Sequence, residues 1–205
     1  DQVAQIQQMH LLLAMYNALQ PGVFALSGWD LCGMVTIDRS QVAQLIVGGD
    51  TRWIHRSAHD LMGVNPTATV SAAGMPKARS LYGTLPDQLA DPTSFARELS
   101  RILTVRKYYG IAAGTLLDVP EVSHRGLLVM VNLTAQDQQQ ITVLNFSAEQ
   151  VNGTVYSAVL PAGSLVTDAF DGTGVGVVDD VHSFALSLGA YQGRALLVHP
   201  PVETG

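Results

Sequence analysis

The stretch LLVMVNLTAQDQQQITVLNFS, residues 127–147, contains two apolar runs separated by a short polar segment. Four further runs of the same kind follow at 153–160, 164–170, 182–189 and 193–200. Turns of Gly, Asn, Asp and Pro separate the runs at regular spacing, and no long helical pattern interrupts them. This arrangement is typical of an antiparallel β-sandwich, which we place at residues 111–205.

The sequence before residue 110 alternates between helical and strand patterns instead. Residues 2–19 carry apolar side chains at helical spacing and end at Pro21-Gly22, which predicts a helix of about five turns. Residues 94–109 predict a second helix, capped by Asp91 or Thr93 and ended by Gly110. Between them, the apolar run 23–26 predicts a strand buried on both faces, residues 39–47 predict a short helix, and residues 65–92 are rich in loop-forming residues.

Composition and charge exclude several classes of protein. The chain has 205 residues, of which 47% are hydrophobic and 14% charged, too apolar for a disordered chain. The net charge of -6 argues against a nucleic-acid or anionic-membrane partner, and the apolar run 11–15 is too short to span a bilayer. Cys32 is the single cysteine, which predicts a reducing, cytoplasmic location.

The charge is divided unevenly along the chain. Residues 1–110 contain nine Lys/Arg and eight Asp/Glu, a net charge of +1, whereas residues 111–205 contain two and nine, a net charge of -7. This change supports a domain boundary near residue 110.

Two tryptophans mark the candidate binding site. Trp29, next to Asp30, follows the expected strand, and Trp53, next to Arg52, lies in a loop rich in charged residues. Aromatic faces beside carboxylates and guanidinium groups suit a sugar, whose C–H faces stack while its hydroxyls bind charged partners. The residue types alone favour the alternative, in which Trp29 packs structurally and the segment 52–60 forms a salt-bridge cluster.

The sequence offers no complete catalytic or metal motif. It contains no Gly-rich phosphate loop, no CxxC and no GxSxG pattern. His55 and His59 have a spacing that could bind zinc on a helix, but Arg56 lies beside His55 and no glutamate follows it. We therefore expect no metal and no cofactor.

Several longer segments resemble the α-amylase superfamily. QPGVFALSGWDLCGM (20–34) resembles its eighth barrel strand, SFARELSRILTVRKYYGIAAG (94–114) its last barrel helix, and VLNFS (143–147) its C-terminal β-domain. Within the superfamily, GDTRWIHR (49–56) and KARSLYGTLPDQLADPTSFA (77–96) are most similar to trehalose synthases, the maltose α-D-glucosyltransferases. His55, Ser57 and His59 depart from that pattern.

The resemblance implies a fold class and an activity. The fold would be the last strand and flanking helices of a (β/α)8 TIM barrel, residues 1–110, followed by the antiparallel β-sandwich. The activity would be interconversion of maltose and trehalose by retaining glucosyl transfer, with some hydrolysis to glucose. The superfamily's catalytic carboxylates precede the segment matched here, so this chain would contribute no catalytic residue. Trp29, Asp30, Arg52 and Trp53 would bind the substrate, and the loop 65–92 would help to enclose it.

The resemblance also implies partners. These are a small sugar (maltose or trehalose) and an upstream barrel segment of a longer protein that begins before Asp1; a homo-oligomer is compatible with it. Two alternatives remain open. One is another α-glucoside enzyme, an isomaltulose synthase or an amylase. The other is a non-catalytic carbohydrate-binding module at 111–205, although no surface row of aromatic residues is evident there.

Overall fold

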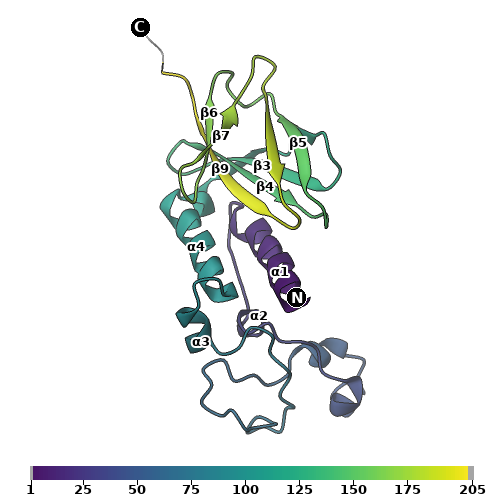
Figure 1. The fold of residues 1–205 in the computed structure, drawn as a ribbon. Coiled ribbons are helices and arrows are strands. Elements are labelled where there is room, and N and C mark those ends of the chain that lie inside the picture. Colours follow the sequence, from purple (N-terminus) through teal and green to yellow (C-terminus); the bar gives the residue numbers. More distant parts are fainter. Residues whose placement is uncertain (1, 203–205) are drawn as a thin grey trace. The chain divides into compact units, whose positions relative to one another are not determined.

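The computed structural model of the chain describes residues 2–202 (Figure 1). These residues form two compact units, one of residues 25–98 and one that combines residues 2–24 with the chain from residue 99 onward. None of the described helices has the length and hydropathy needed to cross a membrane.

The second unit contains two antiparallel sheets. The larger has the order β1 (Thr115–Asp118), β3 (Leu127–Leu133), β4 (Gln139–Asn145), β9 (Gly193–His199), β6 (Leu165–Asp168) and β7 (Gly174–Val177). The smaller has the order β2 (Glu121–Val122), β5 (Val151–Tyr156) and β8 (Ser183–Leu188). The predicted antiparallel sandwich is confirmed, and the six expected strands correspond to β3, β4, β5, β6, β8 and β9.

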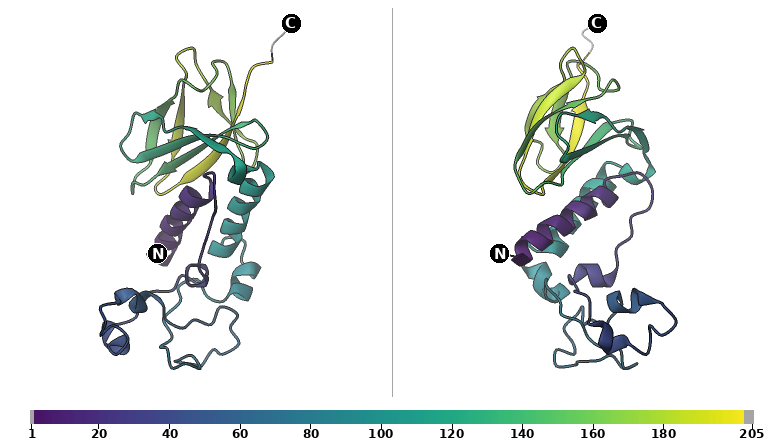
Figure 2. Two further views of the ribbon diagram at one scale, coloured as in Figure 1. Left: turned by 180° about the vertical axis from the view of Figure 1, so that it is seen from behind. Right: turned by 90° about the vertical axis from the view of Figure 1, so that its right-hand side faces the viewer.

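Side-chain alternation along the strands produces the core between the two sheets. Val129 and Val131 of β3, Ile141 and Val143 of β4, and Leu188 of β8 point inward and are almost fully buried. The two sheets lie face to face, as Figure 2 shows from the side. Successive residues of a strand point to opposite faces, so the larger sheet also presents a second apolar face, on the side away from the sandwich core.

Two helices cover that second face. Helix α1 (Gln2–Ala18) and the second half of α4 (Phe95–Tyr108) pack on it. The apolar cluster there contains Leu12, Met15, Ile102, Val105, Met130, Leu144 and Ala195. Gly193 permits this approach, because a Cβ added there would lie 2.7 Å from the Sδ atom of Met15. The expected helices at 2–19 and 94–109 are thus confirmed.

Arg106 fixes the end of α1. Its buried guanidinium group donates hydrogen bonds to the carbonyl oxygens of Ala18, Gln20 and Gly22. These carbonyls lie at the last residue of α1 and just beyond it, where no intrahelical donor remains for them. Gly22 has a φ of +101°, a left-handed conformation that glycine adopts without strain.

The first unit is built mostly from short helices and loops. It contains α2 (Gly28–Leu31), the 3₁₀ helices η1 (Arg39–Val42) and η2 (Thr51–His55), α3 (Leu85–Ala90) and the start of α4, while η3 (Ile111–Ala113) lies in the second unit. A small core of Ile37, Val42, Ile46 and Ala78 holds this unit together. The helix expected at 39–47 is reduced to η1, and α3 replaces part of the expected loop 65–92.

The expected strand at residues 23–26 is wrong for this chain. These residues form neither strand nor helix, and Val23 is 96% exposed. A strand buried on both faces needs neighbouring strands, and no segment among residues 2–202 pairs with this run. The barrel origin of residues 1–110, and the boundary at residue 110, therefore stay predictions.

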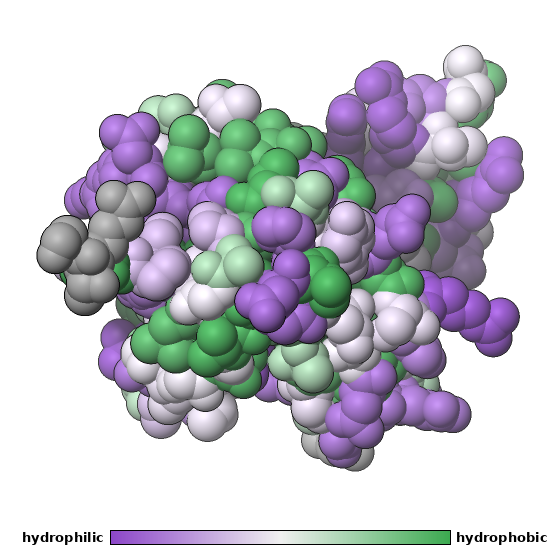
Figure 3. All heavy atoms as spheres, turned by 90° about the horizontal axis from the view of Figure 1, so that it is seen from above, coloured by the Kyte–Doolittle hydropathy of each residue, from purple (hydrophilic) through white to green (hydrophobic). Residues whose placement is uncertain are grey.

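Exposed apolar side chains occur on both α1 and the sandwich. Figure 3 shows hydrophobic patches separated by hydrophilic residues on the face in view. On the sandwich, Leu165, Val177 and Val181 are among the large apolar residues that are 47–65% exposed.

Candidate functional site

Asp30 and Trp29 lie on the short helix α2. Ser27 is the N-cap of this helix, and its backbone N–H and hydroxyl donate to Oδ2 of Asp30 at 3.0 and 2.6 Å. The backbone N–H of Asp30 in turn donates to the Ser27 hydroxyl at 3.3 Å. This reciprocal arrangement is a capping box, so the Asp30 carboxylate has a local structural role in stabilising the start of α2.

Trp29 connects α2 with the segment that follows η2. Its indole Nε1–H donates to the carbonyl oxygen of Ser57 at 2.8 Å, and its ring centroid lies 5.9 Å from that of His59. Trp29 and His59 are half-buried, and their rings are tilted by 60°. The structure therefore places Trp29 and Asp30 on one element and joins that element to residues 57–59.

Arg52 forms an ion pair within its own turn. Its Nε and Nη2 atoms donate to the two carboxylate oxygens of Asp50, both at 2.7 Å, and the Arg52 side chain is 68% exposed. Asp50 also accepts from the backbone N–H of Arg52 at 3.1 Å and so caps η2. These bonds to Arg52 lower the pKa of Asp50 to about 2.

Trp53 is half-buried and packs on the small core around Val42 and Ile46. The four predicted substrate-binding residues thus lie on two elements, α2 and η2, of the same unit. Each of the four makes contacts that stabilise the fold locally. Such contacts are expected if Trp29 packs structurally and the segment 52–60 forms a salt-bridge cluster. Their contact with substrate stays a prediction.

A group of buried and half-buried residues that includes Cys32, just after α2, was not singled out from the sequence. Tyr82 stacks on Phe95, with ring centroids 5.0 Å apart, and its ring lies against Gly33, which has a φ of +60°. Burial, and secondarily the negative charge of Asp30, raises the pKa of Tyr82 to about 12. Burial likewise raises the pKa of the Cys32 thiol. The phenol and the thiol therefore stay neutral beside Asp30 at neutral pH.

Gln88 on α3 anchors the segment 82–96 to α2. The side chain is 2% exposed; its Nε2 donates to the carbonyl oxygen of Leu31 at 2.7 Å, and its Oε1 accepts from the backbone N–H of Ala96 at 3.0 Å. A polar residue contributes nothing to the apolar periodicity by which buried positions are recognised. Only the place of Gln88 in the segment KARSLYGTLPDQLADPTSFA could have indicated that its side chain is buried.

The zinc alternative lacks the helix that it requires. Residues 51–55 form a 3₁₀ helix that ends at His55, so the spacing of His55 and His59 does not place them on one α-helical face. Within residues 2–202, no group of three His, Cys, Asp or Glu side chains has the geometry to hold a metal ion.

Solved structures share this fold. AmyP in complex with maltose matches with a TM-score of 0.62 and 12% sequence identity, over 97% of this chain and 36% of AmyP. The trehalulose synthase MutB from Pseudomonas mesoacidophila MX-45 matches with a TM-score of 0.64 and 16% identity, over 93% of this chain and 38% of MutB. The chain has the fold of these proteins over nearly its whole length.

The chain spans little more than a third of the length of AmyP and MutB. No protein-family model matches the sequence, and no curated protein matches it. At 12–16% identity the structural matches establish the fold alone.

Proposed function

We propose that the chain is the C-terminal part of an α-amylase-superfamily enzyme that interconverts maltose and trehalose. The observation that carries this proposal is the fold match over more than nine-tenths of the chain to a maltose complex and to a trehalulose synthase. The resemblance of residues 20–34, 49–56 and 77–96 to trehalose synthases supports the narrower assignment.

Three carboxylates at and beyond α2, those of Asp30, Asp50 and Asp60, support placing catalysis in another part of the protein. A retaining mechanism needs two carboxyl groups about 5–5.5 Å apart that flank the scissile bond. Asp30 caps α2, Asp50 pairs with Arg52, and Asp60 accepts from the backbone N–H groups of Val64 and Asn65 at 3.0 and 2.7 Å. Each of these carboxylates is held in its own turn, so an upstream segment would supply the catalytic pair.

An exposed apolar stripe on α1 supports the presence of such a segment. Ile6, Met9, Leu13 and Tyr16 follow one another at helical spacing, are 37–53% exposed, and face away from the sheet on which α1 packs. Val23, just beyond the helix, is 96% exposed. Covering these five side chains would stabilise the protein by several kcal/mol, at about 25 cal/mol per Å² of apolar surface buried.

In the proposed mechanism the glucose released from maltose turns within a closed site and attacks the glucosyl-enzyme through another hydroxyl. That outcome requires an enclosed site that excludes water. Arg52, with its exposed guanidinium group, would hold the transferring sugar, and the segment 65–92 would help to enclose it.

The test is product analysis on maltose with the full-length protein. We expect trehalose with some glucose, and no turnover by the 205-residue chain alone. Arg52→Ala should lower the isomerisation rate about tenfold, the cost of one charge-assisted hydrogen bond, and raise the share of glucose. The matched control is Arg39→Ala, another exposed arginine of the same unit.

Other outcomes would contradict the proposal. Complete hydrolysis would indicate an amylase, and no action on maltose would exclude the trehalose synthase assignment. The match to a trehalulose synthase favours a second candidate, an isomerase of another disaccharide, which the same assay tests with other sugars. If Arg52→Ala lowered the midpoint of unfolding and left the isomerisation rate and the share of glucose unchanged, the Arg52–Asp50 pair would be structural.

A further inference from the structure

The segment 57–59 contacts the indole ring of Trp29 in two ways. The carbonyl oxygen of Ser57 accepts a hydrogen bond from the indole Nε1–H at 2.8 Å. Two residues further on, the imidazole of His59 lies with its ring centroid 5.9 Å from that of the indole, at an interplanar angle of 60°. Trp29 is half-buried, so a change in either contact changes how the remaining part of its ring is presented to a ligand.

The backbone on both sides of His59 is anchored. The N–H of Ala58 donates to the carbonyl oxygen of Pro76 at 2.8 Å, and the carbonyl oxygen of Ala58 accepts from the N–H of Ala78 at 3.1 Å. On the other side, the carboxylate of Asp60 accepts from two backbone N–H groups of its own turn. The imidazole therefore reaches the indole from a fixed position, and without movement of the backbone it can leave only by rotation of its own side chain.

Gly28 leaves the space that the imidazole occupies. A Cβ atom added at Gly28 would lie 3.0 Å from Nε2 of His59, closer than ordinary van der Waals contact. Gly28 is the first residue of α2 and directly precedes Trp29. The imidazole of His59 thus packs on the backbone of α2 as well as beside the indole.

The charged groups around His59 have other partners. The ionisable residues on the elements around it are Asp30, Cys32, Arg56, Asp60, Lys77 and Tyr82. Asp30 caps α2, and the carboxylate of Asp60 lies 3.9 Å from Nζ of Lys77. Burial raises the pKa of the thiol and of the phenol, so both are neutral at neutral pH, and Arg56 is exposed. Within residues 2–202 His59 forms no ion pair, so its charge, when it takes up a proton, is met by the indole.

The charge of the imidazole changes the strength of its contact with the indole. A cation within about 6 Å of an aromatic centroid is attracted by the electrons of the ring, and a neutral imidazole lacks this attraction. Histidine is the side chain that changes its charge between pH 5 and 8. A protonated His59 therefore holds the indole more firmly on the segment 57–59, whereas beside a neutral His59 the indole yields more readily to a sugar that stacks on it.

We propose that His59 is a positioning residue of the candidate sugar site, and that its protonation holds Trp29 against the segment 57–59 and so weakens sugar binding at acidic pH. The identity of the ligand rests on the proposed function, whereas the coupling of His59 to Trp29 does not. His59 acts through Trp29 and takes no part in bond breaking, so its effect falls on KM and leaves kcat unchanged.

Tryptophan emission of the 205-residue chain tests the coupling itself. The chain has two tryptophans, so Trp53→Phe leaves Trp29 as the single reporter. We expect its emission to change between pH 5 and 8. His59→Phe and His59→Gln, which cannot be protonated in that range, should both abolish the change. The matched control is His55→Phe, since His55 is an exposed histidine of the same unit, and this variant should retain the change.

Kinetics of the full-length protein on maltose test the consequence for the site. With Trp53 in place, KM should rise about two- to fivefold as the pH falls from about 7.5 to about 5.5, the factor expected for one partly exposed cation–π contact. In His59→Phe and His59→Gln this rise should disappear, while kcat keeps the pH dependence of the unaltered protein. His55→Phe should behave as the unaltered protein does.

The outcomes distinguish this inference from the proposed function. Emission of Trp29 that does not depend on pH, or a pH dependence that survives both His59 substitutions, would overturn the coupling, whatever the full-length protein does to maltose. A pH-dependent KM that is the same in both His59 variants would overturn the positioning role. The expected emission in a protein that does not act on maltose would support the coupling and contradict the proposed function.

Discussion

Arg106→Met tests how much the end of α1 depends on one side chain. Arg106 is 8% exposed and donates to three carbonyl oxygens, those of Ala18, Gln20 and Gly22. Methionine keeps an unbranched, apolar stem and a similar helix propensity, so the substitution removes the guanidinium group with little effect on α4 itself.

The magnitude follows from the burial of the three acceptors. The bond to Ala18 is buried, so its carbonyl loses a partner that water cannot replace, at about 1–3 kcal/mol. The bonds to Gln20 and Gly22 are partly buried, and water replaces them in part. Burial also lowers the pKa of Arg106, a sign of the desolvation cost that the substitution relieves. The net loss is about 3 kcal/mol.

Urea unfolding followed by circular dichroism measures this loss. For a unit of this size, about 3 kcal/mol also corresponds to a drop of roughly 10 °C in the thermal midpoint. Lys107→Met is the matched control, since Lys107 is the next residue of α4, is exposed, and contributes under about 1 kcal/mol through the helix dipole. Equal shifts in the two variants would refute the role assigned to Arg106.

Two further predictions concern one residue each. Bonding to Arg52 lowers the pKa of Asp50 to about 2 from 3.8, so its contribution to stability is complete above pH 3.8 and is lost as the pH falls through 2. Asp50→Asn should remove that part of the acid dependence, measured by tryptophan fluorescence between pH 4 and 2. Gly193→Ala should destabilise the sandwich by about 1–3 kcal/mol in urea unfolding, because its Cβ would overlap a methionine of α1, whereas Gly174→Ala meets nothing within 4 Å and should not.

The sandwich could be predicted because most of its strands are apolar runs that can be recognised from the local sequence. The run 127–133 is β3, the run 182–189 is longer than β8 by one residue at each end, and the run 193–200 is longer than β9 by one residue at its C-terminal end. A run of six or seven β-branched and aliphatic residues that is bounded by turns is typical of a β-strand and of few other structures. β1, β2 and β7 were missed; β2 has only two residues, and β7, GVGV, contains two glycines.

The run 23–26 shows the limit of such patterns. Its apolar residues are compatible with a buried strand, but a strand forms only where another strand supplies hydrogen bonds, and that partner lies outside the local sequence. Similarly, the C-terminal half of α1 is apolar almost all round, yet the sequence could not say which of its faces the sheet would cover. Both features depend on chain segments that pack from elsewhere.

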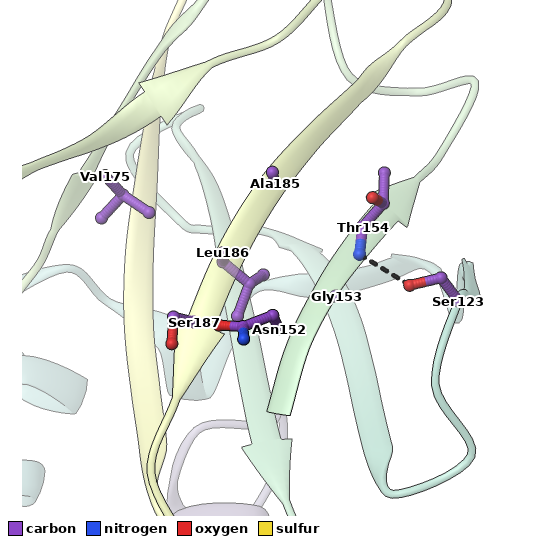
Figure 4. Close-up of a pocket in the computed structure, with 8 residues that line it drawn as sticks. All are labelled: Ser123, Asn152, Gly153, Thr154, Val175, Ala185, Leu186 and Ser187. Carbon is purple, nitrogen blue, oxygen red and sulfur yellow. Dashed lines mark hydrogen bonds between the residues drawn. The ribbon is translucent and has the colours of Figure 1, made fainter. Parts of the chain in front are cut away.

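The fold itself accounts for some of the candidate site residues. Asp30 and Arg52 were suggested by their chemistry, yet Asp30 caps α2 and Arg52 pairs with Asp50, so no ligand is needed to account for either. Asn152 and Thr154 are exposed polar residues on β5, and exposed polar residues on a strand are common. Asn152 lies opposite Ser187 of β8, and Thr154 lies opposite Ala185, a juxtaposition that becomes visible only when the register is known (Figure 4). Because water satisfies exposed polar groups, a missing intramolecular partner indicates a ligand only where the group is buried.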